Sequence, residues 1–496
     1  MAIQTPEQMP ADPLLAEAIW SGRIYGDGWS DAPATIDVVQ PATGAVIGSA
    51  GVADKAAVAR AAASAAAAQV EWAATSFVER ARILRRAADL LERHSEEITG
   101  WMVRESGSIP PKVAVELANS VNQIHQAAGL ATHPIAEVLP SPLPDRTSIA
   151  YRIPVGVVGV ITPWNFPIVL AIRSVAPALV LGNAVVLKSD PNTPVVGGVV
   201  IARLFEEAGL PPGLLHVFSG GADVGTALVE DPNIAMISFT GSTAAGRVVG
   251  ELAGRNLKRV VLELGGNSPL IVLEDADVDA AASAGAFGSF LHQGQICIAT
   301  SRHLVHEKIA PAYVEALAER ARRLPVGNPE TDEVALGPII NEKQLARVTR
   351  IVAESVADGA RVVAGGTADG RFFPPTVLDE VVPEMAVYKE EIFGPVAPVV
   401  TFSDDEQAIA LANDTEYGLS AAIHSRSVDR AERVASRIHA GMVHINDMTV
   451  NEESPAPFGG QGSSGNGGHF GGDANLELFT EWQWRTSRPV ATPFPF

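Results

Sequence analysis

The sequence predicts an α/β fold with two successive units, and three observations carry this prediction. From Arg152 to about position 264, short apolar segments of strand length alternate with segments of helical spacing. A second alternation of the same kind runs from about 269 to 446. The 496 residues also exceed what one hydrophobic core normally organises, so we expect two or three domains. Strands that alternate with helices form a parallel sheet covered by those helices.

The first 151 residues are expected to mix short strands with helices. We expect residues 1–20 to form a loosely held arm, and Gly and Pro-Ala-Thr-Gly turns between short apolar pieces predict strands and hairpins over 24–52. Ser76-Phe77-Val78-Glu79 has the pattern of a capping box at a helix start. Helices are predicted at 53–74, 76–91 and 112–131, and an extended segment at 138–151.

The first unit has the element order of a Rossmann-type sheet. Its strands are predicted at 153–162, 184–189, 215–219, 235–240 and 260–264, and its helices at 169–181, 194–208, 223–230 and 244–253. On such sheets ligands sit at the carboxyl ends of the strands. Three groups of residues occupy that kind of position: Thr162-Pro163-Trp164-Asn165, Lys188 and Phe239-Thr240-Gly241-Ser242.

The second unit is less regular. Its helices are predicted at 278–291, 312–324, 342–358, 405–413 and 428–440, with strands near Val362, Val377, Val396 and Val443. A glycine-rich loop at 458–472 and an extended segment at 476–486 follow. No internal period of 20–50 residues is visible, which argues against a repeat protein.

Composition excludes several classes of partner. A net charge of −21 disfavours nucleic acids and anionic membrane surfaces, both of which need a basic face. The single cysteine excludes an internal disulfide and a cysteine-rich metal site, so we expect no metal and a reducing, cytoplasmic location. The start of the chain lacks the pattern of a secretory leader, and the apolar run 153–161 is too short to span a bilayer.

The single cysteine and a nearby carboxylate are the strongest candidates for chemistry. Cys297 follows Gln293-Gly294-Gln295-Ile296, where glycine permits a close approach of backbone or ligand. Glu263 ends an apolar strand beside Gly265-Gly266. A thiol and a carboxylate are the two groups needed to form an acyl-enzyme and hydrolyse it. The alternatives are a buried structural cysteine and a solvated carboxylate at a strand end.

Two further motifs fit such a reaction. Asn165, in Pro163-Trp164-Asn165-Phe166-Pro167, is either a turn residue or a donor to an oxyanion. Phe239–Thr243 ends a strand and opens a helix, so it is either an ordinary N-cap or a phosphate site. Gly460–Gly465 matches the G-x-G-x-x-G dinucleotide fingerprint. No strand directly precedes it and no helix follows, so we do not interpret it as a dinucleotide site.

The ordered motifs of the chain resemble those of the aldehyde dehydrogenase superfamily over nearly the full length. The matching pieces are Pro163–Pro167, Gly182–Lys188, Gly209–Gly213, Phe239–Ser242, Glu263–Gly266, Gly294–Cys297, Glu390–Pro395 and Pro457–Gly460. Within the superfamily, Gly441–Asp447, Asn466–Gly468 and Phe479–Trp484 look like the benzaldehyde and vanillin dehydrogenases that act on aromatic aldehydes. The last four residues, Pro493–Phe496, look closer to the benzaldehyde branch.

The resemblance implies a mechanism. Cys297 attacks the aldehyde, Asn165 and the Cys297 amide hold the oxyanion, and Glu263 activates the water that hydrolyses the thioester. The implied cofactor is NAD, bound by Thr162, Pro163, Trp164, Lys188, Asp190, Gly241, Ser242, Leu264, Glu391 and Phe393. Pro191 stands where NAD-preferring members often have Glu, so use of NADP is also possible. An apolar tunnel for a flat ring is expected from Phe166, Val169, Ile296, Ile298, Val450 and Phe458. Arg173 faces either this tunnel or a structural carboxylate.

The resemblance also implies a division of the chain and an assembly. We expect a dinucleotide-binding domain at 1–137 and 155–263, a catalytic domain at 264–472, and a small β oligomerisation arm at 138–154 and 473–496. The arm predicts a homodimer or homotetramer. Three other functions remain open at this point: oxidation of vanillin or another substituted or aliphatic aldehyde, acyl transfer to CoA, and a non-catalytic binding protein of the same fold.

Overall fold

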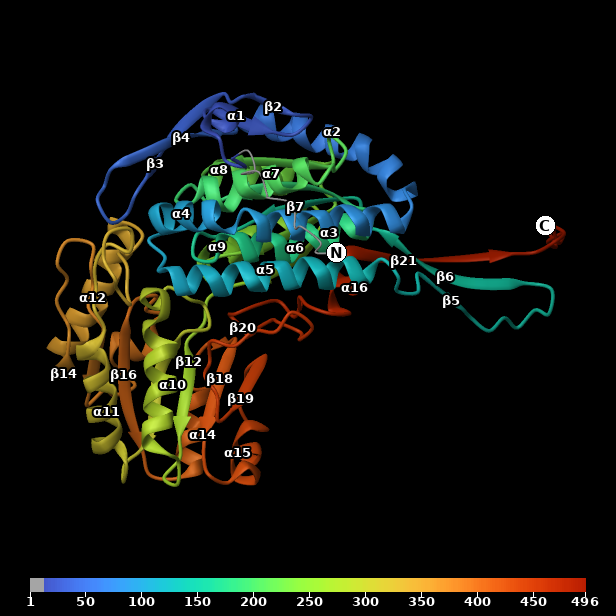
Figure 1. The fold of residues 1–496 in the computed structure, drawn as a ribbon. Helices are drawn as coiled ribbons and strands as arrows, with labels where there is room; N and C mark the ends of the chain where they lie inside the picture. The colour runs from blue at the N-terminus through green and yellow to red at the C-terminus, as the bar shows by residue number, and fades with distance from the viewer. Residues whose placement is uncertain (1–12) are drawn as a thin grey trace, which may run out of the picture.

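The computed structural model describes residues 13–496 as two α/β halves and a projecting arm (Figure 1). The sheet of the first half has the strand order β11-β10-β7-β8-β9-β1-β2, and β4 joins it at β9 and pairs with β3. Its strands are β1 (Arg23–Tyr25), β2 (Trp29–Asp31), β3 (Ala34–Val39), β4 (Val46–Val52), β7 (Val157–Ile161), β8 (Ala184–Ser189), β9 (Leu215–Ser219), β10 (Met236–Thr240) and β11 (Arg259–Glu263). The five central strands β7 to β11 are parallel, which confirms the predicted Rossmann-type sheet.

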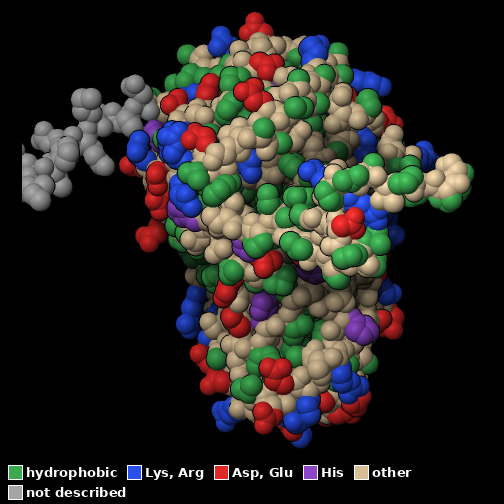
Figure 2. Space-filling view, turned by 90° about the vertical axis from the view of Figure 1, so that its right-hand side faces the viewer, with side chains coloured by type: hydrophobic (Ala, Val, Ile, Leu, Met, Phe, Trp, Pro, Cys, Tyr) green, Lys and Arg blue, Asp and Glu red, His purple; other side chains and the backbone are tan. Residues whose placement is uncertain are grey.

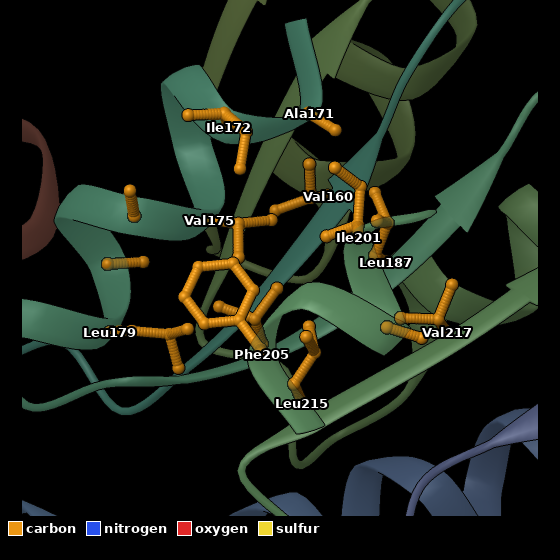
Figure 3. Packing of buried hydrophobic residues seen from close by; sticks show 14 of the residues in the cluster. Val160, Ala171, Ile172, Val175, Leu179, Leu187, Ile201, Phe205, Leu215 and Val217 are labelled. Atoms are coloured by element: carbon orange, nitrogen blue, oxygen red, sulfur yellow. The ribbon is translucent and has the colours of Figure 1, made fainter. Parts of the chain in front are cut away.

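The core of the first half lies between this sheet and its helices. Every residue of β7, β8 and β9 is buried, as expected for central parallel strands covered on both faces. Figure 3 shows Val160 and Leu187 of the sheet against Val175 and Phe205 of the covering helices. The helices are α2 (Lys55–Ala74), α3 (Phe77–Arg93), α4 (Ser95–Ser106), α5 (Pro110–Leu130), α6 (Pro167–Val180), α7 (Val200–Glu207), α8 (Ala222–Glu230) and α9 (Thr243–Arg255), with a π-helical turn at Val195–Val199.

The parallel register places the predicted ligand-binding groups at one edge. Lys188 pairs with Ile161, Phe239 pairs with Ile161 on the other side, and Thr240 pairs with Glu263. The carboxyl ends of β7, β8, β10 and β11 therefore lie side by side, as expected for a binding edge.

The second half has the strand order β14-β15-β16-β13-β12-β18-β19. Its strands are β12 (Ser268–Val272), β13 (Thr300–His306), β14 (Arg361–Ala364), β15 (Thr376–Asp379), β16 (Val396–Phe402), β18 (Ser420–His424) and β19 (Met442–Ile445); β17 (Tyr417–Gly418) pairs separately with β20 (Gln461–Gly462). Its helices are α10 (Val278–Phe290), α11 (Ala310–Arg323), α12 (Glu342–Ala357), α13 (Ala386–Lys389), α14 (Asp405–Asn413) and α15 (Val428–Ala435). The sequence did not predict the central strands β12, β13 and β18, which hold this sheet together.

The arm is a three-stranded antiparallel sheet that extends to one side of the molecule (Figure 1). Strand β6 (Thr147–Pro154) lies between β5 (Ala136–Val138) and β21 (Thr480–Ser487), and β6 and β21 pair over eight residues. The prediction of an extended segment at 476–486 was partly wrong, because α16 (Ala474–Phe479) occupies its beginning. The side chain of Phe479 is fully buried there, so this turn of helix anchors the arm to the first half.

Two other differences concern the N-terminal region. The expectation of a loose arm over 1–20 was wrong for its described part, since Leu14, Leu15 and Trp20 are buried in the first core; residues 1–12 lie outside the described part. Helix α4 was not predicted, because its N-cap residue, His94, makes no side-chain cap that could mark the helix start. The division into domains at the expected boundaries stays a prediction.

Over the described residues 13–496, no helix combines the length and the apolar character needed to cross a bilayer. On the face that Figure 2 shows, acidic and basic side chains are interspersed and do not form one basic patch.

Candidate active site

Cys297 lies just after a sharp turn that ends α10. His292, Gln293 and Gly294 follow one another with φ values of 48°, 55° and 66°, all in the left-handed region. A side chain at Gly294 would meet the carbonyl oxygen of Gly394 at 2.2 Å, so only glycine fits there. This turn reverses the chain direction and presents Cys297, which is partly exposed.

Glu263 ends β11 and is buried, with an exposed fraction of 2%. Within the described residues neither carboxylate oxygen has a hydrogen-bond partner. Burial raises the pKa of Glu263 well above 4.5, the Arg173 guanidinium partly offsets this, and the Glu452 carboxylate adds to it. A buried carboxyl group of this kind takes up a proton at a higher pH than usual, which suits a general base.

The thiol of Cys297 is electrostatically linked to the same groups. Burial raises its pKa to about 12, and the charges of Glu391, Glu263 and Glu452 add to this increase while Arg173 opposes it. At neutral pH the thiol of the unliganded site is therefore protonated. Attack on a carbonyl needs a base to accept the thiol proton. The Glu263 charge acts on the thiol, although neither carboxylate oxygen is within hydrogen-bond distance of it.

Two glycines after Glu263 allow the two halves to meet at the site. A Cβ atom on Gly266 would lie 2.3 Å from the carbonyl oxygen of Cys297, and one on Gly265 would lie 2.5 Å from a carboxylate oxygen of Glu391. The Gly266 amide donates a hydrogen bond of 3.0 Å to Glu391 Oε1. The Glu-Leu-Gly-Gly motif therefore brings the end of β11 against both Cys297 and Glu391.

Replacement of Gly266 by Ala is expected to lower kcat by about 10²-fold, because the new methyl group must displace the Cys297 backbone and a shift near 1 Å costs roughly that much. The matched control is Gly100→Ala in α4, where the added Cβ meets nothing within 4 Å. Steady-state kinetics at saturating substrates measures both variants. A wild-type kcat in the Gly266→Ala enzyme would show that the close approach has no catalytic importance.

Asn165 lies between β7 and α6 and is buried, with an exposed fraction of 4%. Its side-chain Nδ2 donates a hydrogen bond of 2.9 Å to the backbone carbonyl of Gln295, two residues before Cys297. An amide nitrogen carries two hydrogens, so one N–H remains for a ligand oxygen. Of the three residues that the sequence predicted as catalytic, Asn165 is thus tied to the cysteine loop, and Glu263 interacts with Cys297 by charge; their catalytic roles stay a prediction.

A cavity of about 170 Å³ joins Cys297 to the edge of the first sheet. It is lined by Pro163, Trp164, Asn165, Leu170, Thr240, Gly241, Ser242, Leu264, Gly265, Cys297, Gln344, Arg347, Glu391 and Phe393. Most of the predicted cofactor residues are therefore in one place. The Ser242 hydroxyl caps α9, whose first amides point toward this edge.

Five lining residues were not predicted as site residues: Leu170, Thr240, Gly265, Gln344 and Arg347. The last two come from α12. Arg347 donates a hydrogen bond of 2.6 Å to the Glu391 carbonyl, and Gln344 donates one of 3.0 Å to the Phe393 carbonyl. They hold the loop on which Phe393 has a φ of 56° and meets Trp164 edge-to-face, with ring centroids 5.5 Å apart. No local pattern in 342–358 distinguishes these two polar residues from others on a surface helix.

Three predicted cofactor residues lie outside the lining of this cavity. Lys188 is buried, and its ammonium donates to the carbonyls of Gly220 at 2.7 Å and Ser189 at 3.0 Å. The Asp190 carboxylate accepts hydrogen bonds from the backbone and side chain of Asn192. Thr162 is buried, and its hydroxyl has no partner within the described residues.

Cys297 belongs to an apolar cluster. Its buried members are Ile296, Ile298, Ala299, Leu419 and Phe458, with Phe166, Leu291, Met442, Val450 and Cys297 partly buried against them. Five of the six apolar tunnel residues that the sequence predicted are in this cluster. Val169 is buried but lies outside it, and its amide donates to a carboxylate of α5.

Arg173 has a carboxylate partner. It donates to Glu452 at 2.5 Å, and Gln123 donates to the same carboxylate at 2.8 Å. The guanidinium also lies 4.0 Å from the ring centre of Phe458, a member of the apolar cluster. Arg173 therefore packs against the apolar cluster at Phe458, and its charge acts on Glu263 and Cys297.

Comparison with known proteins identifies what this arrangement resembles. The sequence model of the aldehyde dehydrogenase family matches residues 29–485. A vanillin dehydrogenase from an Amycolatopsis species is 55% identical, covering 97% of this chain and 100% of that protein. The benzaldehyde dehydrogenase [NAD(+)] of Pseudomonas putida is 51% identical, covering 97% and 99%. The crystal structure of a salicylaldehyde dehydrogenase from Pseudomonas putida G7 complexed with salicylaldehyde has a TM-score of 0.93, with 37% identity over 96% of this chain and 99% of that one.

Proposed function

Because this chain belongs to the aldehyde dehydrogenase family, we propose that it oxidises an aromatic aldehyde of the benzaldehyde type to the carboxylic acid with NAD+ and water. The observation that carries the proposal is the single cavity lined by Cys297, Asn165 and the helix-start residues Gly241 and Ser242. A nucleophile, an oxyanion donor and a nucleotide-binding edge face the same space.

The chemistry follows from the positions of the side chains. Glu263 accepts the thiol proton as the sulfur of Cys297 bonds to the aldehyde carbon, and the oxygen becomes an alkoxide. The Asn165 amide and the Cys297 backbone N–H donate to that oxygen. Loss of hydride from the same carbon leaves a thioester. Glu263 passes the thiol proton to solvent and then removes a proton from water, whose oxygen attacks the thioester. The acid leaves, and the proton held by Glu263 returns to the sulfur and restores the thiol.

The edge of the first sheet fits NAD. The start of α9 at Ser242 offers free amides to a pyrophosphate, and Gly241 leaves room for it. Lys188 and Glu391 are the residues we expect to bond the two ribose groups. When bound, the nicotinamide supplies the acceptor for the hydride. Pro191 puts no carboxylate three residues after Lys188, so NADP stays a second candidate.

The apolar cluster favours an aromatic substrate over a small polar one. Phe166 and Phe458 offer flat surfaces, and Ile296 and Ile298 flank the sulfur. The names of the two curated relatives, vanillin and benzaldehyde dehydrogenase, point in the same direction. Glu263 favours water over CoA as the acyl acceptor, because hydrolysis needs a base at this position.

The experiment that tests this function is a steady-state comparison of benzaldehyde, vanillin, salicylaldehyde and a short aliphatic aldehyde, each with NAD+ and with NADP+. The highest kcat/KM is expected for an aromatic aldehyde with NAD+, and product formation should not depend on CoA. A clear preference for the aliphatic aldehyde would contradict the substrate assignment. No turnover with any of the four would contradict the proposed catalysis.

The pH dependence of kcat is expected to show an acid limb well above pH 4.5. Since burial raises the pKa of Glu263, the carboxyl becomes protonated, and inactive as a base, at a pH where an exposed glutamate is still ionised. Burial also raises the pKa of Glu391, to about 7. Its protonation is expected to change KM for NAD+ and not kcat, because kcat is measured at saturating NAD+. A kcat that stays constant down to pH 5 would contradict the role of Glu263.

We propose that the arm joins two copies of the chain. Strand β21 is at the edge of its sheet, and Trp482 and Trp484 on it are exposed by 46% and 65%. An unpaired edge with exposed aromatic residues suits pairing with another subunit. Light scattering is expected to give a dimer or tetramer, and truncation before Thr480 is expected to give smaller species. A monomeric full-length enzyme would contradict this assembly.

We also propose a reducing compartment, the cytoplasm, because the mechanism needs Cys297 as a free thiol.

A further inference from the structure

We propose that Lys112 and Glu116 of α5 are positioning residues for the oxyanion donor, because they brace both sides of the loop that carries Asn165. The inference rests on the proposed function, in which Asn165 binds the substrate oxygen. Lys112 and Glu116 are 1% and 0% exposed, so the two charges lie in the protein interior. They are separated from the loop by about 50 positions in the sequence.

The first brace is a cap supplied to α6 by another helix. The residue before α6 is Phe166, whose side chain cannot accept a hydrogen bond, and Pro167 has no amide hydrogen. Glu116 Oε1 instead accepts from the amides of Ile168 at 2.9 Å and Val169 at 3.3 Å. A carboxylate at the positive end of a helix is favourable, so Glu116 fixes where α6 begins.

The second brace acts on Asn165 itself. Lys112 Nζ donates a hydrogen bond of 2.8 Å to the Asn165 carbonyl and one of 2.5 Å to Glu116 Oε2. The same ammonium lies 4.1 Å from the ring centre of Phe166. Since the peptide unit is planar, fixing the Asn165 carbonyl fixes the orientation of the bond that leads to Phe166.

The side chain of Asn165 is thereby held from both directions. Its backbone is fixed by Lys112, and its Nδ2 is fixed by the carbonyl of Gln295 in the cysteine loop. The remaining N–H of the amide then has a defined direction with respect to Cys297. Stabilisation of an oxyanion depends on such fixed donors, because no energy is then spent in reorienting them during the reaction.

The burial of the pair supports a role beyond stability. A buried ion pair is often no more stabilising than apolar residues of the same size, because removing two charges from water is costly. Burial lowers the pKa of Lys112, and the Glu116 carboxylate opposes this. The other titratable group that faces Lys112 is His292, whose pKa burial and the Lys112 charge hold well below 6.5, so this ring is neutral.

The test is a double-mutant cycle between Lys112→Met and Asn165→Ala, read as kcat at saturating benzaldehyde and NAD+. Asn165→Ala is expected to lower kcat by about 10²–10³-fold. Lys112→Met is expected to lower kcat by roughly 10- to 100-fold, the cost of a misplaced catalytic group, with Kd for NAD+ unchanged. In the Asn165→Ala background, Lys112→Met is expected to change kcat by no more than about twofold, since it acts through Asn165. Lys112→Arg, which keeps the charge and the donors, is expected to recover part of the loss.

Two controls separate positioning from folding. Lys258→Met removes a lysine that donates to the backbone carbonyl of Asp231, and Leu317→Ala destabilises the second half; both are expected to keep the wild-type kcat. If Lys112→Met does not fold, the Lys112→Met/Glu116→Leu enzyme replaces it, because this pair leaves no unpaired charge. That enzyme is expected to fold and to keep the kcat defect.

The outcomes distinguish this inference from the function on which it rests. If Asn165→Ala lowers kcat while the Lys112 variants keep the wild-type kcat, the positioning role is wrong and the proposed function stands. If the kcat loss of the double variant equals the product of the losses caused by Lys112→Met and Asn165→Ala alone, the positioning role is also wrong. If Asn165→Ala itself has no effect on kcat, the oxyanion role in the proposed function fails.

Discussion

Replacement of Cys297 by Ala is expected to reduce aldehyde oxidation by roughly 10⁴-fold or more, the size of effect that follows loss of a covalent nucleophile. The physical reason is that no other group can take the place of the sulfur. Cys297 is the only cysteine of the chain, and Asn165 and Glu263 cannot form a stable acyl adduct that loses hydride. The measurement is the formation of reduced cofactor from benzaldehyde and NAD+.

The same variant should bind cofactor normally. The groups expected to hold NAD+ are at the start of α9 and on Lys188 and Glu391, and none of them changes. Titration of cofactor binding is therefore the control, together with the midpoint of thermal unfolding. Oxidation at a substantial rate in a well-folded Cys297→Ala enzyme would remove the thioester from the mechanism.

Replacement of Glu263 by Gln is expected to separate the two halves of the reaction. Hydrolysis of the thioester should slow by about 10²–10⁴-fold, the usual contribution of a general base. Because Glu263 also accepts the thiol proton, the burst of about one reduced cofactor per site, followed by a slow steady rate, is expected on rapid mixing at alkaline pH. Because the thiol pKa is about 12, the burst itself should be faster at alkaline pH, where the thiol ionises without Glu263.

A buried carboxyl group elsewhere provides the matched control for Glu263→Gln. Glu105 is fully buried and accepts hydrogen bonds from the amides of Val195 and Val196. Glu105→Gln makes the same chemical change outside the site and should show no burst. If Glu263→Gln turned over at the wild-type rate, or lost the burst at every pH, the assignment of Glu263 to hydrolysis would be wrong.

The sequence predicted the first sheet better than the second, and the reason is visible in particular strands. Strand β8 begins with four apolar residues, Ala184–Leu187, and β9 contains Leu215, Val217 and Phe218, so their burial could be expected. Strand β13 is equally buried but contains Arg302 and His303, residue types that are less often fully buried. The Arg302 guanidinium donates hydrogen bonds to the backbone carbonyls of Asn267, Leu411 and Ala412. Only the folded chain brings these three carbonyls near Arg302.

The residues that we propose as catalytic could be singled out because local motifs carry them. Cys297, Glu263 and Asn165 each lie within three residues of a glycine or proline that marks a special backbone. Their supporting residues have no such signal. Lys112 and Glu116 resemble an exposed helix pair four residues apart, although Val113 and Leu117 beside them belong to the buried stripe. Their partners on α6 lie more than 50 residues away, and spacing along the chain gives no indication of that contact.

The central claim is that the sulfur of Cys297 carries the acyl group between oxidation and hydrolysis. The most direct measurement mixes the Glu263→Gln enzyme with benzaldehyde and NAD+, stops the reaction with acid, and locates the benzoyl group by peptide mass spectrometry. We expect the added mass on the peptide that contains Cys297, in an amount close to one per site. Reduced cofactor formed in that amount with no benzoyl group on Cys297 would contradict the account.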